Sequence, residues 1–367
     1  MKNILDSLLA EQSSACPECF RFGNADGKVW IMPRRRMRTA MEVYQPSGRS
    51  GKLLKSLLPH PLFGSIVGRR IGAERLRLGL SVELRRTLAS VFGPLPLEFS
   101  IFCGTPGKNR KITMQLSRRN QILGYCKFTD DAAIARLFDH EVRVLDTLRD
   151  AGVTGLPAAL KRGRLADGTE FFLQSTVKTA DSTVIHEWGR PHDEFVERLY
   201  TATAKRIPFD QTDYYRQLVE FLHHIDWIPF EEDRDFVRGE VLRVLADHKG
   251  EEMEVAACHC DFTPWNTFAN GEELCVFDWE FGRLTYPKGL DRCHFFMQTA
   301  IFERRLDADA IAAELTSGNV DWYDAETFRM YLVEIMSRFM LREKGTPTPD
   351  VLASYRIWLQ LLKHLPN

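Results

Sequence analysis

The order of the secondary-structure signals between residues 97 and 177 is the feature that most constrains the fold. Three short runs of alternating or apolar residues predict strands. A longer run, in which apolar side chains recur at three- and four-residue intervals, predicts a helix, and one more strand follows. These segments are residues 97–103, 111–116, 122–128, 131–149 and 170–177. The pattern predicts a small α+β lobe.

The rest of the chain, from about residue 190, has mainly helical periodicity. The expected helices are 192–205, 211–226, 233–248, 322–343 and 349–364. Residues 255–279 are the exception, because they contain a short strand-like stretch. A strand-rich part is therefore followed by a mainly helical part.

Composition excludes several classes of protein. The chain has 367 residues, of which 44% are hydrophobic, and this length suggests two or three domains. It has no run of 18 apolar residues that could span a membrane. Charge interrupts the opening residues too early for a signal peptide. Without such a signal, the eight cysteines are expected to be reduced thiols, and we expect a cytoplasmic protein.

The charge is distributed unevenly, although the formal net charge is only −1. Residues 1–95 hold 16 Lys and Arg against 7 Asp and Glu, whereas the remainder holds 33 against 43. This basic region of unknown role has three interpretations: an extra lobe with solvated cations, a peripheral contact with an anionic membrane surface, or a nucleic-acid site. The run Arg34–Arg36 lacks interleaved aromatic residues, which argues against nucleic acid.

Two cysteines in this basic region, Cys16 and Cys19, form half of a zinc-ribbon pattern. Structural zinc usually takes four ligands, and no second Cys-x-x-Cys follows. The spacing therefore favours a plain turn or weak redox chemistry over a zinc site.

The chemistry is expected in the strand-like stretch at 255–279. His259, Asp261, Pro264 and Asn266 form the pattern His-x-Asp-x-x-Pro-x-Asn, and Asp278 begins an Asp-Trp-Glu triplet twelve residues after Asn266. Such a set suits phosphoryl transfer. One carboxylate accepts or orients the acceptor hydroxyl, while an amide oxygen and a second carboxylate hold Mg²⁺ against nucleotide phosphates.

This pattern resembles the catalytic and metal loops of the aminoglycoside phosphotransferase and choline kinase family, which has a protein-kinase-like fold. The resemblance implies that Asp261 is the catalytic base, that Asn266 and Asp278 bind the metal, and that His259 braces the loop. It also implies that Asp291 ties this loop down from a later element. The resemblance covers about residues 97–300 and leaves residues 1–95 outside.

The same resemblance assigns nucleotide-binding residues in the strand-rich part. It implies that Lys127, in the third strand, holds the phosphates of ATP and that Glu141, in the following helix, orients this lysine. The turn at 103–110, with Gly104 and Gly107, is where a phosphate-covering loop belongs, and Lys108 and Arg110 are candidate phosphate contacts. Adenine would lie near Gln174 and Thr176, between the lobes.

The resemblance therefore implies a two-lobed kinase-like fold preceded by the basic region, with domains at 1–95, 96–178 and 179–367. The expected activity is ATP- and Mg²⁺-dependent phosphorylation of a hydroxyl of a small molecule, a sugar or glycan precursor. The alternatives are a non-catalytic kinase-fold scaffold and a protein kinase. The triplet His259-Cys260-Asp261 lacks the arginine that reads activation-loop phosphate, and no Ala-Pro-Glu follows Asp278, which argues against a protein kinase. Acceptor identity, ATP against GTP, and oligomeric state are not encoded in any pattern recognised in the sequence.

Overall fold

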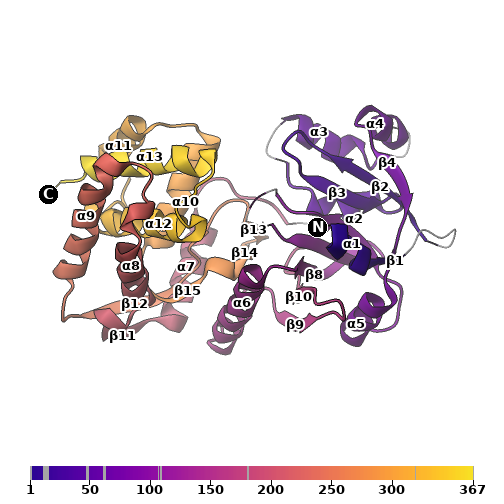
Figure 1. The fold of residues 1–367 in the computed structure, drawn as a ribbon, viewed down its shortest axis with the longest axis horizontal. Helices are drawn as coiled ribbons and strands as arrows, with labels where there is room; N and C mark the ends of the chain where they lie inside the picture. The colour runs from indigo at the N-terminus through magenta and orange to yellow at the C-terminus, as the bar shows by residue number, and fades with distance from the viewer. Residues whose placement is uncertain are drawn as a thin grey trace. The chain divides into compact units, whose positions relative to one another are not determined.

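The computed structural model describes residues 2–10, 16–46, 49–60, 63–105, 107, 110–179, 182–318 and 320–366. Its contacts divide the chain into two compact units. Unit 1 comprises residues 1–146 and 157–181, and unit 2 comprises residues 147–156 and 182–367. Both are labelled in Figure 1. Among the described residues, no helix combines the length and apolar character needed to cross a membrane.

Unit 1 is built on one antiparallel sheet of eight strands, in the order β4-β2-β3-β6-β7-β8-β10-β9. The strands are β2 Glu18–Gly23, β3 Val29–Pro33, β4 Glu74–Arg77, β6 Glu98–Phe102, β7 Ile112–Arg118, β8 Gln121–Thr129, β9 Ala159–Arg164 and β10 Glu170–Ser175. Four of the five segments expected at 97–177 match β6, β7, β8 and β10, and the fifth matches helix α6, Ala132–Asp150. β9 was not predicted from the sequence.

Helices cover both faces of this sheet because its strands alternate apolar side chains to either side. In β3, Trp30 and Met32 join one hydrophobic cluster and Ile31 joins another. The first cluster lies under α2 Met37–Ala40, η1 Met41–Val43, α3 Arg49–Leu57 and α4 Gly64–Arg70. The second lies under α1 Lys2–Leu8 and α5 Val82–Phe92, and the short strands β1 Leu9–Ala10 and β5 Gly79–Leu80 pair beside it.

The expected boundary before residue 96 is not seen in unit 1. β3, from the basic region, pairs directly with β6, with Trp30 opposite Phe102 and Ile31 opposite Ile101. Residues 1–95 therefore extend the sheet of residues 96–178 and do not form a separate body. The Gly93-Pro94 punctuation ends α5 but does not end the domain, because the chain returns to the same sheet three residues later.

Unit 2 is mainly helical. Its helices are α7 Arg190–Thr203, α8 Asp213–His223, α9 Arg234–Asp247, α10 Leu290–Gln298, α11 Ala308–Thr316, α12 Ala325–Glu343 and α13 Pro349–His364, with the π-helical η6 Thr299–Glu303 continuing α10. Short 3₁₀ helices are η2 Phe209–Gln211, η3 Ile225–Trp227, η4 Glu231–Asp233 and η5 Trp279–Phe281. Helix α12 is buried along its length and packs against α8, α10 and α13 (Figure 1). The five expected helices match α7, α8, α9, α12 and α13, whereas α10 and α11 were not predicted.

Two small sheets carry the loops of unit 2. One has the order β11-β12-β15, with β11 Lys205–Pro208, β12 Glu252–Cys258 and β15 Arg283–Pro287. The other is a hairpin of β13 Thr267–Asn270 and β14 Glu273–Val276. The strand-like stretch expected at 255–279 is thus the end of β12, a loop and this hairpin.

The buried His192 in the first turn of α7 predicts an acid-sensitive stability. Its Nδ1 accepts a hydrogen bond from the Gly189 N–H at 3.2 Å, while its Nε2 has no partner, and burial lowers the pKa to about 4. The unfolded state binds a proton below pH 6.5, but the folded state resists doing so until about pH 4. Stability is therefore complete above pH 6.5 and falls by about 3 kcal/mol on going down to pH 4.

Urea unfolding at pH 7 and pH 4 tests this expectation with His192→Gln, because glutamine is also accepted in a capping box but does not titrate. The variant should lose about 3 kcal/mol less than the wild type over this interval. Equal losses in the two proteins would show that His192 does not control the acid response.

Candidate active site

In unit 1, the central strand β8 carries a buried lysine that forms an ion pair with helix α6. The Lys127 Nζ lies 2.8 Å from Oε1 and 2.6 Å from Oε2 of Glu141, and both side chains are almost inaccessible to solvent. β8 is held between β7 and β10, so Lys127 stands opposite Thr113 and Phe172. A buried charge requires such a partner. The pair fixes the ammonium group, whereas its role in phosphate binding stays a prediction.

The turn between β6 and β7 requires glycine at one position. Gly104 has a φ of +73°, and a Cβ there would lie 2.3 Å from the carbonyl oxygen of Lys111. Gly107 also has a positive φ, of +153°, with open space around it. Arg110 donates from Nε to the carbonyl of Cys103, and Lys108 lies outside the described residues. The expected covering of phosphates by this turn stays a prediction.

The two residues expected near adenine lie at the end of β10 and just after it. Gln174 is buried, and its Oε1 has no hydrogen-bond partner in the described structure. Its backbone lies close to β8, because a Cβ on Gly124 would stand 2.2 Å from the Gln174 carbonyl oxygen. The Thr176 hydroxyl accepts from the N–H of Lys178 at 3.0 Å. Their contact with a nucleotide also stays a prediction.

In unit 2, the loop of residues 258–266 follows β12 and is held from below by the first turn of α10. Asp291 accepts the backbone N–H of His259 at 2.8 Å and that of Cys260 at 2.9 Å, and its Oδ1 lies 3.2 Å from the Cys258 Sγ. These bonds support a backbone in which Cys260 has a φ of +63°. Asp291 thus ties the loop down as the sequence pattern suggested.

His259 braces the loop and has no free ring nitrogen. Its Nδ1 accepts the N–H of Asp261 at 3.2 Å, so its Nε2 donates to the carbonyl of Phe277 at 3.0 Å. The ring lies against Trp279, with 4.6 Å between centroids. Burial lowers its pKa despite the opposing charges of Asp291 and Asp261. A neutral histidine with both nitrogens bonded to the backbone is a scaffold for the loop.

The carboxylate of Asp261 is held on both oxygens. Its Oδ1 lies 3.2 Å from Nε2 of His294, and its Oδ2 accepts from Nδ2 of Asn266 at 2.8 Å. Burial raises the pKa of Asp261, but the hydrogen bond and charge of His294, with the charges of Arg338 and His259, outweigh it, so the net pKa is lowered. The group is therefore ionised at neutral pH and can accept a proton.

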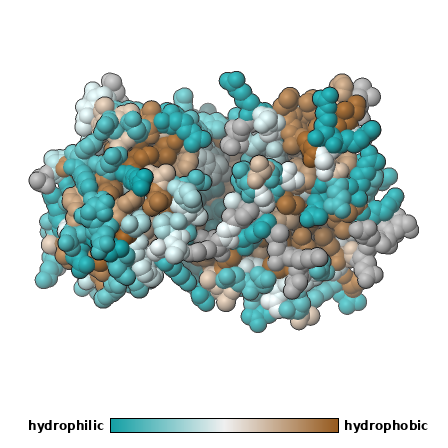
Figure 2. Space-filling view, turned by 45° about the horizontal axis from the view of Figure 1, so that its top comes forward, coloured by the Kyte–Doolittle hydropathy of each residue, from teal (hydrophilic) through white to brown (hydrophobic). Residues whose placement is uncertain are grey.

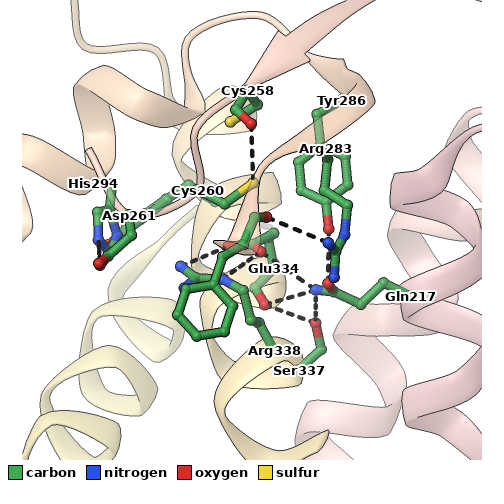
Figure 3. Close-up of polar contacts among 12 residues, drawn as sticks. Gln217, Cys258, Cys260, Asp261, Arg283, Tyr286, His294, Glu334, Ser337 and Arg338 are labelled. Atoms are coloured by element: carbon green, nitrogen blue, oxygen red, sulfur yellow. Dashed lines mark hydrogen bonds and ion pairs between the residues drawn. The ribbon is translucent and has the colours of Figure 1, made fainter. Parts of the chain in front are cut away.

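His294 connects this carboxylate to the core of unit 2. Its Nδ1 lies 3.2 Å from the hydroxyl of Tyr331, on α12, and Figure 3 shows its ring facing Asp261. Sequence reasoning missed this residue. A signal was present, since Asp291 and His294 are three residues apart and so share one face of α10.

The two expected metal ligands stand at the open end of the β13–β14 hairpin. Asn266 directly precedes β13 and Asp278 follows β14 by two residues, and the Phe277 N–H donates to the Asn266 carbonyl at 3.1 Å. The Nδ2 of Asn266 donates to both the backbone and the side chain of Asp261, which leaves its amide Oδ1 as the oxygen available for a cation. Amide and carboxylate oxygens are ligands that Mg²⁺ accepts, so the residues present fit the ion.

A buried polar network supports the 258–266 loop from α12 (Figure 3). Arg338 Nε lies 2.8 Å from Glu334 Oε1, and Gln217 Nε2 donates to the Glu334 backbone carbonyl at 3.2 Å. The Tyr286 hydroxyl donates to the side-chain oxygen of Gln217 at 2.7 Å. The charges of Glu334 and Asp261 contribute to a raised pKa of Arg338 despite its burial, so this cation stays charged below the loop. The sequence contained no recognisable signal for this network.

The edge of the loop presents two exposed aromatic residues. Trp265 and Phe302 are each 38% exposed, and their rings meet edge to face with 6.3 Å between centroids. Phe302 lies on η6, which continues the helix that carries Asp291 and His294. One helix therefore contacts the loop at its base, at Asp261 and at its exposed edge.

The sequence of this region matches that of a known family. Residues 126–287 match the sequence model of the phosphotransferase enzyme family. Over these residues, the chain is a member of that family. The phosphotransferase segment runs from the strand of Lys127 through the 258–266 loop to Asp278 and the end of β15.

Solved structures agree with this phosphotransferase fold. A thermostable mutant of aminoglycoside phosphotransferase APH(4)-Ia in its apo form matches with a TM-score of 0.50 at 12% identity, over 76% of this chain and 98% of that one. The same protein in a ternary complex with ADP and hygromycin B gives a TM-score of 0.50 at 12% identity, over 77% and 98%. Choline kinase LicA from Streptococcus pneumoniae has a TM-score of 0.48 at 13% identity, over 76% and 97%. No curated protein sequence matches the chain.

The expectation of a kinase-like α+β fold is therefore confirmed. At such low identity, these structures carry an argument about fold alone. The roles of the individual side chains depend on the geometry described above.

Proposed function

We propose that this protein is an ATP- and Mg²⁺-dependent phosphotransferase that phosphorylates a hydroxyl of a small molecule, a sugar or glycan precursor. The observation that carries this proposal is the ionised Asp261, held by His294 and Asn266 in a loop whose far end leads to Asp278. The family match over residues 126–287 supports the reaction type.

In the proposed reaction, the acceptor hydroxyl oxygen attacks the γ-phosphorus while the bond to the ADP oxygen breaks. The hydroxyl proton passes to Asp261, which His294 and Asn266 hold in place. Mg²⁺, held by the oxygens of Asn266 and Asp278, would neutralise charge on the phosphates. Lys127, fixed by Glu141, would contact phosphate oxygens, and the turn of Gly104 and Gly107 would offer backbone N–H groups. Catalysis thus depends on positioning and electrostatics.

A sugar acceptor is supported by the exposed pair Trp265 and Phe302. Trp265 lies four residues after Asp261, and aromatic rings beside a few polar groups are typical of small-molecule sites. An aromatic surface can pack against the apolar face of a sugar ring. A phosphotransfer screen with Mg·ATP against sugars, amino alcohols and aminoglycosides tests this assignment. Turnover with amino alcohols but with no sugar would contradict it.

Nucleotide binding distinguishes this function from a non-catalytic scaffold. Mg·ATP at one hundred times its Kd should stabilise the protein by about 2.7 kcal/mol, seen as a rise in Tm. Absence of any stabilisation would favour the scaffold.

Lys127→Met is expected to weaken Mg·ATP binding at least about tenfold, because a charge-assisted contact to phosphate is lost. The thermal shift at fixed Mg·ATP should shrink accordingly. Lys161→Met is the matched control, since Lys161 lies on β9 of the same sheet and bonds only Ser90 at 2.9 Å among the described contacts. An unchanged ATP shift in Lys127→Met would contradict the role of Lys127.

A further inference from the structure

The helices α3 and α4 of unit 1 pack together and have apolar residues on two sides. On the inner side, Leu54, Leu58 and Val67 join the cluster of Phe20 and Trp30. Gly68 lies directly over Phe20, because a Cβ at this position would stand 3.2 Å from that ring. The inner side therefore explains how the two helices are attached to the sheet.

The outer side has apolar residues that the fold does not use. Leu53 is 59% exposed, Phe63 is 49% exposed and Ile66 is 51% exposed. Leu53 lies on α3, Ile66 lies on α4, and Phe63 is the residue before α4. Figure 2 shows hydrophobic surface next to strongly hydrophilic side chains over this part of unit 1. Three large apolar side chains gathered in two adjacent short helices indicate an interaction surface.

The charge around these residues is of one sign. Residues 43–73 contain five Lys and Arg and no Asp or Glu. Lys55 is partly neutralised by Glu42, at 3.4 Å. By contrast, Lys52, Arg69 and Arg70 are exposed and form no ion pair with any residue that the structure describes. In α4, Ile66 and Arg69–Arg70 are three and four residues apart, so the cations lie next to the apolar side chain.

We propose that this α3–α4 surface, formed by Lys52, Leu53, Phe63, Ile66, Arg69 and Arg70, binds the protein to an anionic lipid bilayer. Exposed apolar side chains can enter the boundary between headgroups and acyl chains, while unpaired cations contact anionic headgroups. A nucleic-acid partner would use the cations but leave Leu53 and Ile66 without a role. The proposal goes beyond the phosphotransferase function and does not depend on it.

Co-sedimentation with vesicles tests the proposal without nucleotide or acceptor. The full chain should bind vesicles of phosphatidylcholine with 30% phosphatidylglycerol at least about tenfold more tightly than pure phosphatidylcholine vesicles. The double variant Arg69→Gln, Arg70→Gln should weaken this binding about 25-fold, at about fivefold for each cation. The double variant Leu53→Glu, Ile66→Glu should abolish it.

Val82→Glu is the matched control, since Val82 is 57% exposed on α5, outside this surface, and the variant should bind like the wild type. Thermal unfolding confirms that each variant is folded. Equal binding to neutral and anionic vesicles would overturn the proposal, as would wild-type binding by the Leu53→Glu, Ile66→Glu variant. Binding to a 20-nucleotide DNA without vesicle binding would assign the surface to nucleic acid.

Discussion

Asp261→Asn is expected to lower the turnover number about 10³-fold, within the 10²- to 10⁴-fold range of a positioned general base. The asparagine keeps the shape of the side chain but cannot accept the proton. It also places an amide against Asn266 or His294, where the carboxylate now accepts two hydrogen bonds. Because the reacting group is lost and the nucleotide residues are unchanged, kcat should fall far more than the Kd for Mg·ATP rises.

Steady-state ATP consumption with the acceptor found in the screen, together with the Mg·ATP thermal shift, measures these two quantities. Asp307→Asn is the matched control, because Asp307 is a carboxylate that caps α11 by accepting the Ala310 N–H at 2.9 Å. Asparagine is an equally good cap, so this variant should keep full turnover. Full turnover in Asp261→Asn would rule out the assigned mechanism.

Glu334→Gln is expected to lower the free energy of unfolding by about 3–5 kcal/mol, because it leaves the buried Arg338 without its counter-charge. Both side chains are at most 5% exposed, so solvent cannot replace the lost partner. The change also weakens the network around Gln217 and Ser337, beneath the 258–266 loop. Urea unfolding at pH 7 measures the effect.

The exposed ion pair of Arg21 and Glu74 provides the contrast. Its side chains are 51% and 54% exposed, so Glu74→Gln should change stability by about 1 kcal/mol or less. The double variant Glu334→Leu, Arg338→Met should be more stable than Glu334→Gln, because it removes both buried charges. A loss of under about 1 kcal/mol in Glu334→Gln would show that Arg338 finds another partner.

Local sequence patterns predicted the elements that have strong periodicity and the loops that carry the chemistry. Period-two alternation placed β6, β7 and β8, and the spacing of His259, Asp261 and Asn266 indicated a phosphotransfer loop before any geometry was known. The pairing of β3 with β6 was not predictable in this way, because two short strands separated by a helix carry no mark of which edge they join. For this reason the basic region looked separate in the sequence.

The support of the site was also beyond local patterns. His294 and Glu334 contact the 258–266 loop or its network from helices that come later in the chain, and a contact between distant segments leaves no local periodicity. α10 was missed because nearly all of its residues are buried, polar ones included, so it lacks the polar face of an amphipathic helix. Buried His and Glu side chains in α10 and α12 thus escaped a search based on hydrophobic spacing.

The hairpin between Asn266 and Asp278 has a consequence for recognising distant relatives. Its register places Thr267 opposite Val276 and closes through a tight turn at Gly271, which has a φ of +62°. Lengthening both strands by one residue would add two positions between the two ligands without moving their Cα atoms apart. The interval of twelve residues is therefore a property of this hairpin's length, and the reaction does not require it. Searches for homologues that fix this interval would overlook proteins with a longer or shorter hairpin, whereas searches that allow even-numbered changes would retain them.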